Sequence, residues 1–190
     1  MVYVFKCGNH SKALCVSLLF DLDNHRMVVA FILEKNNMDT QQVEIIGRNL
    51  LVSACVADGL EVSQPLRDRG IDLIIFDDHA RHGQFSALPV QLKASSSRSF
   101  SIHAKYAKFP NLLMAYTWHS DNPVDARLYI MTYQDALDVA KEVGWLSTSS
   151  WKDGGGYSTQ APSKKLQNLL EVYQYTPGRI KVLMEASQLN

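Results

Sequence analysis

With 190 residues, the chain is long enough for one globular domain and a small appendage. Its composition, 46% hydrophobic and 20% charged, provides a sizeable core and excludes an intrinsically disordered chain. The 19 basic residues balance the 19 acidic ones, which argues against a protein that coats long stretches of duplex.

The three cysteines are scattered and form no CxxC pair, which is typical of reduced thiols in a cytoplasmic protein. The longest apolar stretches, residues 13–20 and 27–33, are too short to span a bilayer, so we expect no membrane association. The first stretch follows two lysines, as in a signal peptide. However, Asp21 ends it and no small-residue cleavage site follows.

The first predicted element is a hairpin. Residues 13–22 and 27–33 have strand-like composition, and Asp23-Asn24 provides a turn. We therefore expect residues 1–37 to form an N-terminal hairpin or extension, and residues 38–190 to form the main domain.

A helix is predicted next, with Thr40 as its N-cap and apolar residues at helical spacing up to Asp58-Gly59. Three strands follow, and the remaining pattern predicts two further strands, a long loop and helices at the C-terminus. The expected ranges are strands 61–65, 71–77 and 87–95, a short helix or turn over 101–109, strands 112–118 and 127–131, a helix from Thr132 to about 143, a loop over 145–161, and helices from 162 to about 173 and from 177. This order predicts an α/β domain of three layers around a central mixed sheet.

Polar residues stand out on the two central strands. A hairpin centred at His82-Gly83 places Asp72 opposite Lys93, and Gln91 points the same way as Lys93 because side chains alternate along a strand. Leu92 points into the core, but its carbonyl oxygen stays close to the group. The pattern therefore brings carboxylate, amide and ammonium groups to one face.

Such a group can serve phosphodiester hydrolysis. Mg²⁺ prefers oxygen ligands, which Asp72, Gln91 and the Leu92 carbonyl provide, and Glu44 on the preceding helix can reach the metal directly or through water. Lys93 can position the attacking water or stabilise the transition state. The alternative is structural: Asp72 and Lys93 form a salt bridge and Gln91 is an edge polar residue.

At these residues the sequence resembles the PD-(D/E)XK nuclease superfamily, which includes restriction endonucleases and Holliday-junction resolvases. The likeness covers roughly residues 41–118, and it is similar to prokaryotic branches with a Gln-x-Lys motif. It implies a restriction endonuclease-like αβββαβ core, a divalent metal (Mg²⁺, with Mn²⁺ as a substitute) and cleavage of DNA. The catalytic residues that it implies are Glu44, Asp72, Gln91 and Lys93. Gln91 departs from the superfamily pattern, in which an acid stands, so metal affinity is expected to be lower.

Four basic residues near the motif are candidate contacts to the DNA backbone: Arg48, Arg69, Arg98 and Lys105. Each can instead be a solvated surface charge, and Arg48 can simply pair with Glu44 one helical turn before it. Three hypotheses follow: a metal-dependent DNA endonuclease, which can act as a homodimer; an inactive nuclease-like module that binds nucleic acid or protein; and a small subunit of a larger system.

Overall fold

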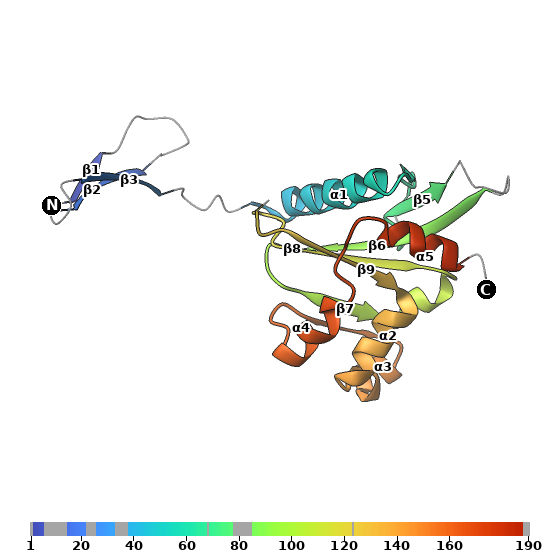
Figure 1. Cartoon of the computed structure of the whole chain (residues 1–190). Coiled ribbons are helices and arrows are strands. Elements are labelled where there is room, and N and C mark those ends of the chain that lie inside the picture. The colour runs from blue at the N-terminus through green and yellow to red at the C-terminus, as the bar shows by residue number, and fades with distance from the viewer. Residues whose placement is uncertain are drawn as a thin grey trace. The chain divides into compact units, whose positions relative to one another are not determined.

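The computed structural model describes residues 2–5, 15–21, 26–32 and 38–187, apart from residues 68, 78–84 and 123. The chain divides into two compact units, Met1–Met38 and Asp39–Asn190 (Figure 1). Each unit has a sheet of its own.

The first unit is a three-stranded antiparallel sheet in the order β1-β2-β3. Its strands are β1 (Val2–Phe5), β2 (Cys15–Asp21) and β3 (Arg26–Ile32). The expected hairpin is present as β2 and β3, while β1 was not expected. The predicted turn at Asp23-Asn24 lies outside the described residues.

The second unit is built on a five-stranded sheet in the order β4-β5-β6-β8-β9. Its strands are β4 (Glu61–Ser63), β5 (Leu73–Asp77), β6 (Ser86–Ala94), β8 (Leu113–Trp118) and β9 (Arg127–Thr132). β6 and β8 run parallel, and the other neighbouring strands are antiparallel. The mixed central sheet predicted from the sequence is therefore confirmed.

Helices and a small second sheet complete this unit (Figure 1). The helices are α1 (Thr40–Ala57), α2 (Tyr133–Glu142), α3 (Ser149–Lys152), α4 (Lys164–Glu171) and α5 (Arg179–Ser187), with 3₁₀ turns η1 (Ala104–Lys108) and η2 (Trp145–Ser147). The small sheet pairs β7 (Phe100–His103) with β10 (Gly156–Thr159). The prediction of a loop over 145–161 is wrong: this range contains η2, α3 and β10, and β10 depends on pairing with the distant β7. The short helix or turn expected over 101–109 is present in part as η1, while the first residues of that range belong to β7.

Both ends of α1 are set by local side chains. The N-cap is Asp39, whose carboxylate accepts from the Gln42 N–H while the Gln42 side chain accepts from the Asp39 N–H. The predicted cap at Thr40 is thus one residue late, since Asp39 is the stronger acceptor and has extended backbone angles. Asp58 and Gly59 end the helix as expected, with Gly59 at φ 75°.

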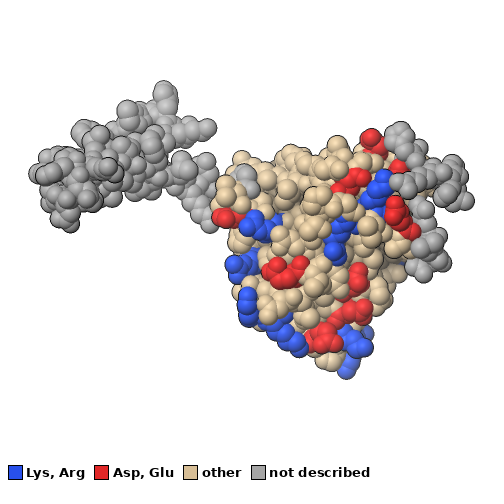
Figure 2. Space-filling view, in the orientation of Figure 1, with Lys and Arg blue, Asp and Glu red and all other residues tan. Residues whose placement is uncertain are grey.

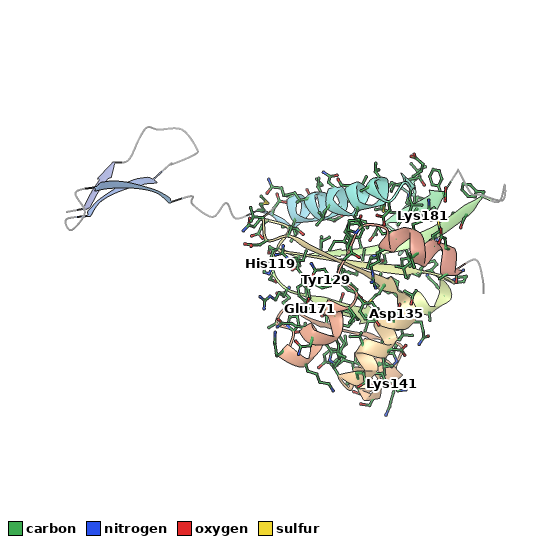
Figure 3. The ribbon with its side chains drawn as sticks, viewed as in Figure 1. His119, Tyr129, Asp135, Lys141, Glu171 and Lys181 are labelled. Atoms are coloured by element: carbon green, nitrogen blue, oxygen red, sulfur yellow. The ribbon has the colours of Figure 1, made fainter. Side chains whose placement is uncertain are left out.

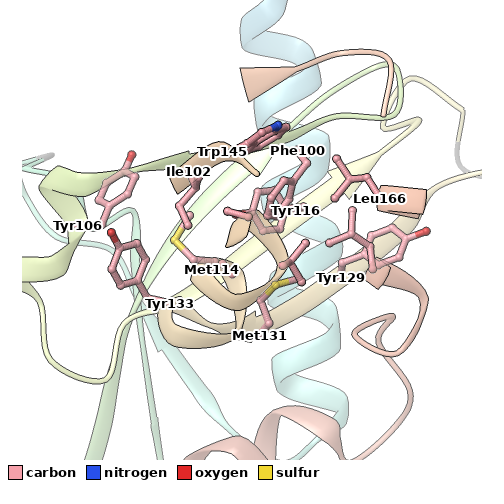
Figure 4. Close-up of a cluster of buried hydrophobic side chains, with 14 of the residues drawn as sticks. Phe100, Ile102, Tyr106, Met114, Tyr116, Tyr129, Met131, Tyr133, Trp145 and Leu166 are labelled. Carbon is pink, nitrogen blue, oxygen red and sulfur yellow. The ribbon is translucent and has the colours of Figure 1, made fainter. Parts of the chain in front are cut away.

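The sheet of the second unit has a hydrophobic core on each face. On one face, α1 and α5 cover a cluster that includes Leu73, Val90 and Leu92. On the other face, β7, α2 and α4 cover a cluster rich in aromatic residues (Figure 4), in which Tyr116 and Met131 are buried. The result is the three-layer α/β arrangement predicted from the sequence.

A buried carboxylate ties α5 to α1. Asp58 is 8% exposed and accepts from the backbone N–H groups of Gly178 at 2.6 Å and Ile180 at 2.9 Å. The Tyr175 hydroxyl donates to the same carboxylate at 2.8 Å. Nearby, Cys55 is a buried free thiol, as expected; the side chains of the other two cysteines lie outside the described part. Among the described residues, no helix has both the length and the apolar character needed to cross a bilayer.

Candidate active site

The structure brings Asp72 into direct contact with the Gln-x-Lys motif on β6. The Asp72 carboxylate accepts from the Leu92 N–H at 2.7 Å and from the Gln91 side-chain amide. The same amide nitrogen donates to the Leu92 carbonyl oxygen at 3.2 Å. Three of the four predicted metal-ligand residues therefore form one hydrogen-bonded group.

The strand register differs from the prediction. The β5–β6 pairing ends with Leu73 opposite Val90, and the Asp72 N–H donates to the Val90 carbonyl at 2.8 Å. Asp72 therefore lies beside Gln91 and not opposite Lys93. The connection over residues 78–84, from which the register was predicted, lies outside the described residues. Because the error is two residues and side chains alternate with period two, the predicted face is unchanged.

Lys93 shares this face of the sheet. In the parallel pairing of β6 and β8, Gln91 is beside Met114 and Lys93 is beside Tyr116, and both partners belong to the aromatic core. The Lys93 ammonium lies 5.7 Å from the centre of the Tyr106 ring on η1. This places the ammonium over a buried aromatic ring.

The loop before Asp72 packs against the same 3₁₀ turn. Gly70 has φ 95°, and a Cβ there would lie 3.3 Å from Phe109 and 3.5 Å from Tyr106. A left-handed backbone conformation next to aromatic rings suits glycine, which has no side chain. Tyr106 is thus close both to the loop that carries Asp72 and to the Lys93 ammonium on β6.

The Gln91 amide has a defined orientation. Its side chain is buried, at 5% exposure, and its nitrogen faces two oxygen acceptors, the Asp72 carboxylate and the Leu92 carbonyl. An amide oxygen in that position would face two other oxygens without a proton between them, so the nitrogen belongs there. In this orientation the amide N–H group, which carries a positive partial charge, compensates the negative charge of the Asp72 carboxylate.

The oxygen ligands of this group fit a hard cation, but few of them are charged. Asp72, the Leu92 carbonyl and the Gln91 amide oxygen are all oxygen donors of the kind that Mg²⁺ and Mn²⁺ accept. Asp72 contributes the one negative charge among them. Over the part of the chain that the structure describes, no cluster of three or more His, Cys, Asp or Glu side chains is arranged to hold a metal ion. A site built here depends on neutral oxygens and water.

Glu44 lies on a different layer from this group. It is on α1, whose buried residues pack against the opposite face of the sheet. Its side chain is 58% exposed and forms an ion pair with Arg48 one turn later. The pairing alternative for Arg48 is the one observed, and the role of Glu44 as a metal ligand stays a prediction.

The other predicted DNA contacts lie at separate places. Arg69 is exposed in the loop before Asp72, whereas Lys105 is on η1 and lines a pocket with Lys93. Arg98 donates to Gln167 on α4 at 2.9 Å and lines another pocket. That pocket is also lined by His119, Tyr129 and Glu171, which Figure 3 labels.

The surface charges do not form one large basic area on the face that Figure 2 shows, where both signs are interspersed. This distribution agrees with the zero net charge of the chain. The face in Figure 2 therefore has no broad basic surface for an anionic partner.

Sequence reasoning did not assign His103 or Tyr106 to the site. His103 ends β7, and its position next to Lys93 depends on how β7 lies over the sheet and pairs with β10. Local spacing carries no signal for this contact.

Comparisons with known proteins identify no family. No family model matches the chain, and no curated protein matches it. Among solved structures, the chain is similar to the structure of a bacterial homing endonuclease, with 13% sequence identity, a TM-score of 0.39, and coverage of 80% of this chain and 95% of that one. At this identity and TM-score, the likeness supports no conclusion about function.

Proposed function

We propose that the second unit is a Mg²⁺-dependent DNA endonuclease of the PD-(D/E)XK type, with Mn²⁺ as an alternative cation. The observation that carries this proposal is the group formed by Asp72, Gln91 and the Leu92 carbonyl, with Lys93 two residues along the same strand face. These are the oxygen donors and the ammonium group that phosphodiester hydrolysis requires.

The residues have distinct tasks. Asp72, the Leu92 carbonyl and the Gln91 amide oxygen would hold the cation, which would require the Gln91 amide to turn over so that its oxygen replaces its nitrogen. Bound Mg²⁺ supplies charge neutralisation and a water of lowered pKa. Lys93 stabilises the negative charge that develops on the phosphate oxygens. The Tyr106 ring, 5.7 Å away, holds the ammonium in place.

The test is cleavage of supercoiled plasmid and of short branched duplexes with Mg²⁺ or Mn²⁺. We expect Asp72→Asn and Lys93→Met each to lower the rate at least 100-fold, because each removes a charge that acts in the transition state. Matched controls are Asp138→Asn, an exposed carboxylate on α2, and Lys108→Met, an exposed lysine on η1. Equal rates for the site variants and their controls would show that this group is not an active site.

A second candidate is a nuclease-like module that binds nucleic acid or a partner protein without cleaving. The orientation of Gln91 favours it, because the amide nitrogen already satisfies Asp72 and the Leu92 carbonyl. Titration calorimetry separates the two. Mg²⁺ or Mn²⁺ binding that disappears in Asp72→Asn supports the enzyme, and no binding at millimolar metal supports the module.

The cytoplasmic location and a homodimeric state complete the proposal. The buried free thiol of Cys55 agrees with a reducing compartment. Two copies of a single-site nuclease would cut both strands of a duplex. Sedimentation of the protein with and without DNA measures the number of copies.

A further inference from the structure

A pocket of about 290 Å³ opens beside Lys93, between η1, β7 and β10. Its polar groups are Lys93, Lys105, His103, Ser101 and Ser158, and among the described residues no carboxylate lines it. The pocket that contains Arg98 differs, because Asp125 and Glu171 offset two of its three cationic side chains. The pocket at Lys93 thus has an excess of positive charge and of hydrogen-bond donors.

One buried ring organises these basic groups. Tyr106 is 3% exposed, and the ammonium groups of Lys93 and Lys105 lie 5.7 Å and 5.2 Å from its centre. The His103 ring meets the Tyr106 ring edge-on at 6.3 Å. Because Lys93 and Lys105 both line the pocket, an anion bound in it would offset the repulsion between these like charges.

His103 adds a donor of fixed direction. Its Nδ1 accepts from the Lys105 N–H at 3.1 Å, so in the neutral ring the proton is on Nε2. Burial, together with Lys105 and Lys93, lowers the pKa of His103. The lowered pKa favours the neutral ring, whose Nε2–H can donate one hydrogen bond to a ligand.

The walls of the pocket are held rigidly. The side chains of Trp118, Tyr116 and Tyr133 donate to the carbonyl oxygens of Ser99 at 2.5 Å, Ser101 at 2.8 Å and His103 at 3.0 Å. These three bonds fix one side of β7 over the sheet, and β10 pairs with it in register. A pocket with fixed walls loses little conformational entropy when a ligand binds.

Glycine brings β10 close to β7. A Cβ at Gly156 would lie 2.7 Å from the Ile102 carbonyl oxygen and 2.9 Å from the His103 ring, closer than real contacts allow. Tyr157, next in the strand, packs against Trp145 with its ring centre 4.5 Å away and keeps 40% of its surface exposed. The rim therefore has an aromatic surface next to the basic groups.

We propose that this pocket binds a backbone phosphate of the nucleic acid, next to the phosphodiester that Asp72 and Lys93 act on. This inference rests on the proposed function. Lys105 and His103 are then binding residues that position the substrate, and Lys93 stands between the pocket and the hydrolytic group. Free phosphate has the same chemistry, so the experiment separates the two sources.

The test measures binding of a fluorescent duplex by anisotropy in EDTA at several salt concentrations. Lys105→Gln is expected to weaken binding for every sequence and to lower the slope of log K against log salt by about 1, because one phosphate contact is lost. His103→Gln should weaken binding with an unchanged slope, because a neutral donor releases no counterion. The control is Lys108→Gln, whose ammonium lies over Phe109 at 4.9 Å and outside the pocket.

Several outcomes would overturn the assignment. Equal affinity and slope for Lys105→Gln and Lys108→Gln would show that the pocket takes no phosphate of the duplex. If inorganic phosphate raises the melting temperature of the wild type but not of Lys105→Gln, while duplex affinity is the same in both, the pocket takes a free anion. Loss of cleavage in Asp72→Asn with normal duplex binding by Lys105→Gln would leave the endonuclease proposal standing and refute the pocket.

Discussion

Gln91→Glu restores the acid that the superfamily pattern has and removes the donor that this fold uses. Without metal, a carboxylate at this position faces the Asp72 carboxylate and the Leu92 carbonyl in a site where the native side chain is 5% exposed. The lost hydrogen bond to a charged group alone is worth about 1.5–3 kcal/mol. Repulsion between the two carboxylates adds to this.

The total cost has an upper limit set by protonation. The new carboxyl can take up a proton and then donate to Asp72 as the amide does. At pH 8 this uptake costs about 5 kcal/mol for a carboxyl with an unfolded-state pKa of about 4.3, and at pH 5 it costs about 1 kcal/mol. We therefore expect destabilisation of about 3–5 kcal/mol at pH 8 in EDTA, falling to about 1 kcal/mol at pH 5. The destabilisation grows with pH because the carboxyl has a higher pKa in the folded state than in the unfolded state. Above the unfolded-state pKa, the unfolded protein can release the proton and the folded protein cannot.

The assay is urea denaturation at both pH values, with EDTA or Mg²⁺. Mg²⁺ at 100 times its dissociation constant should return about 2.7 kcal/mol, because two carboxylates now bind it. The control is Gln91→Met, which has a similar length without donor or charge and should show neither the pH dependence nor the rescue. Wild-type stability of Gln91→Glu at pH 8 in EDTA, or equal Mg²⁺ stabilisation of both variants, would refute the reasoning.

Three further predictions concern the scaffold. Asp58→Ala should lower the unfolding free energy by about 3–4 kcal/mol, because the backbone N–H groups of Gly178 and Ile180 lose their acceptor. An unchanged urea midpoint would show that these hydrogen bonds do not stabilise the fold. Gly47→Ala should lower the melting temperature, although alanine has the better helix propensity. The new Cβ would lie 2.4 Å from Thr117 Oγ1 and 2.6 Å from Ala94 Cβ, which is too close. A higher melting temperature would show that α1 can move away from the sheet at little cost. Burial raises the pKa of the Cys55 thiol from 9.0 to about 12. The thiol therefore contributes to stability below pH 9, and this contribution is lost as the pH rises toward 12. Between pH 9 and 10.5 we expect the unfolding free energy to fall by about 2 kcal/mol, and Cys55→Ala should not show this fall in the same urea titrations.

Much of the site could be predicted from the chain because its signals are local. Alternation along β6 placed Gln91 and Lys93 on one face and Leu92 in the core, and the structure agrees. The register was wrong by two residues, because it was inferred from an assumed turn centre. Because side chains alternate with period two, the predicted sheet face of Asp72 stayed correct. Its contact partner is Gln91, whereas Lys93 was predicted.

The elements that were missed have distant partners. β10 is a strand because it pairs with β7, more than 50 residues earlier, whereas the run Gly154–Gly156, whose last residue begins β10, is typical of a loop. In the same way, the three aromatic donors that fix β7 come from β8 and the start of α2. Neither pairing leaves a periodic pattern in the chain.

The sequence by itself determined the order of α1 and of the five strands of the central sheet, the two faces of the central strands, and that Asp72 and Gln91 share one face. It could do so because helix and strand periodicities and cap residues act over a few positions. Only the tertiary structure decided that Glu44 belongs to the layer opposite this group, that the Gln91 nitrogen compensates Asp72, and that Lys93 faces a basic pocket with His103. Those facts depend on which surfaces bury one another across the fold, and burial joins residues whose distance along the chain carries no signal.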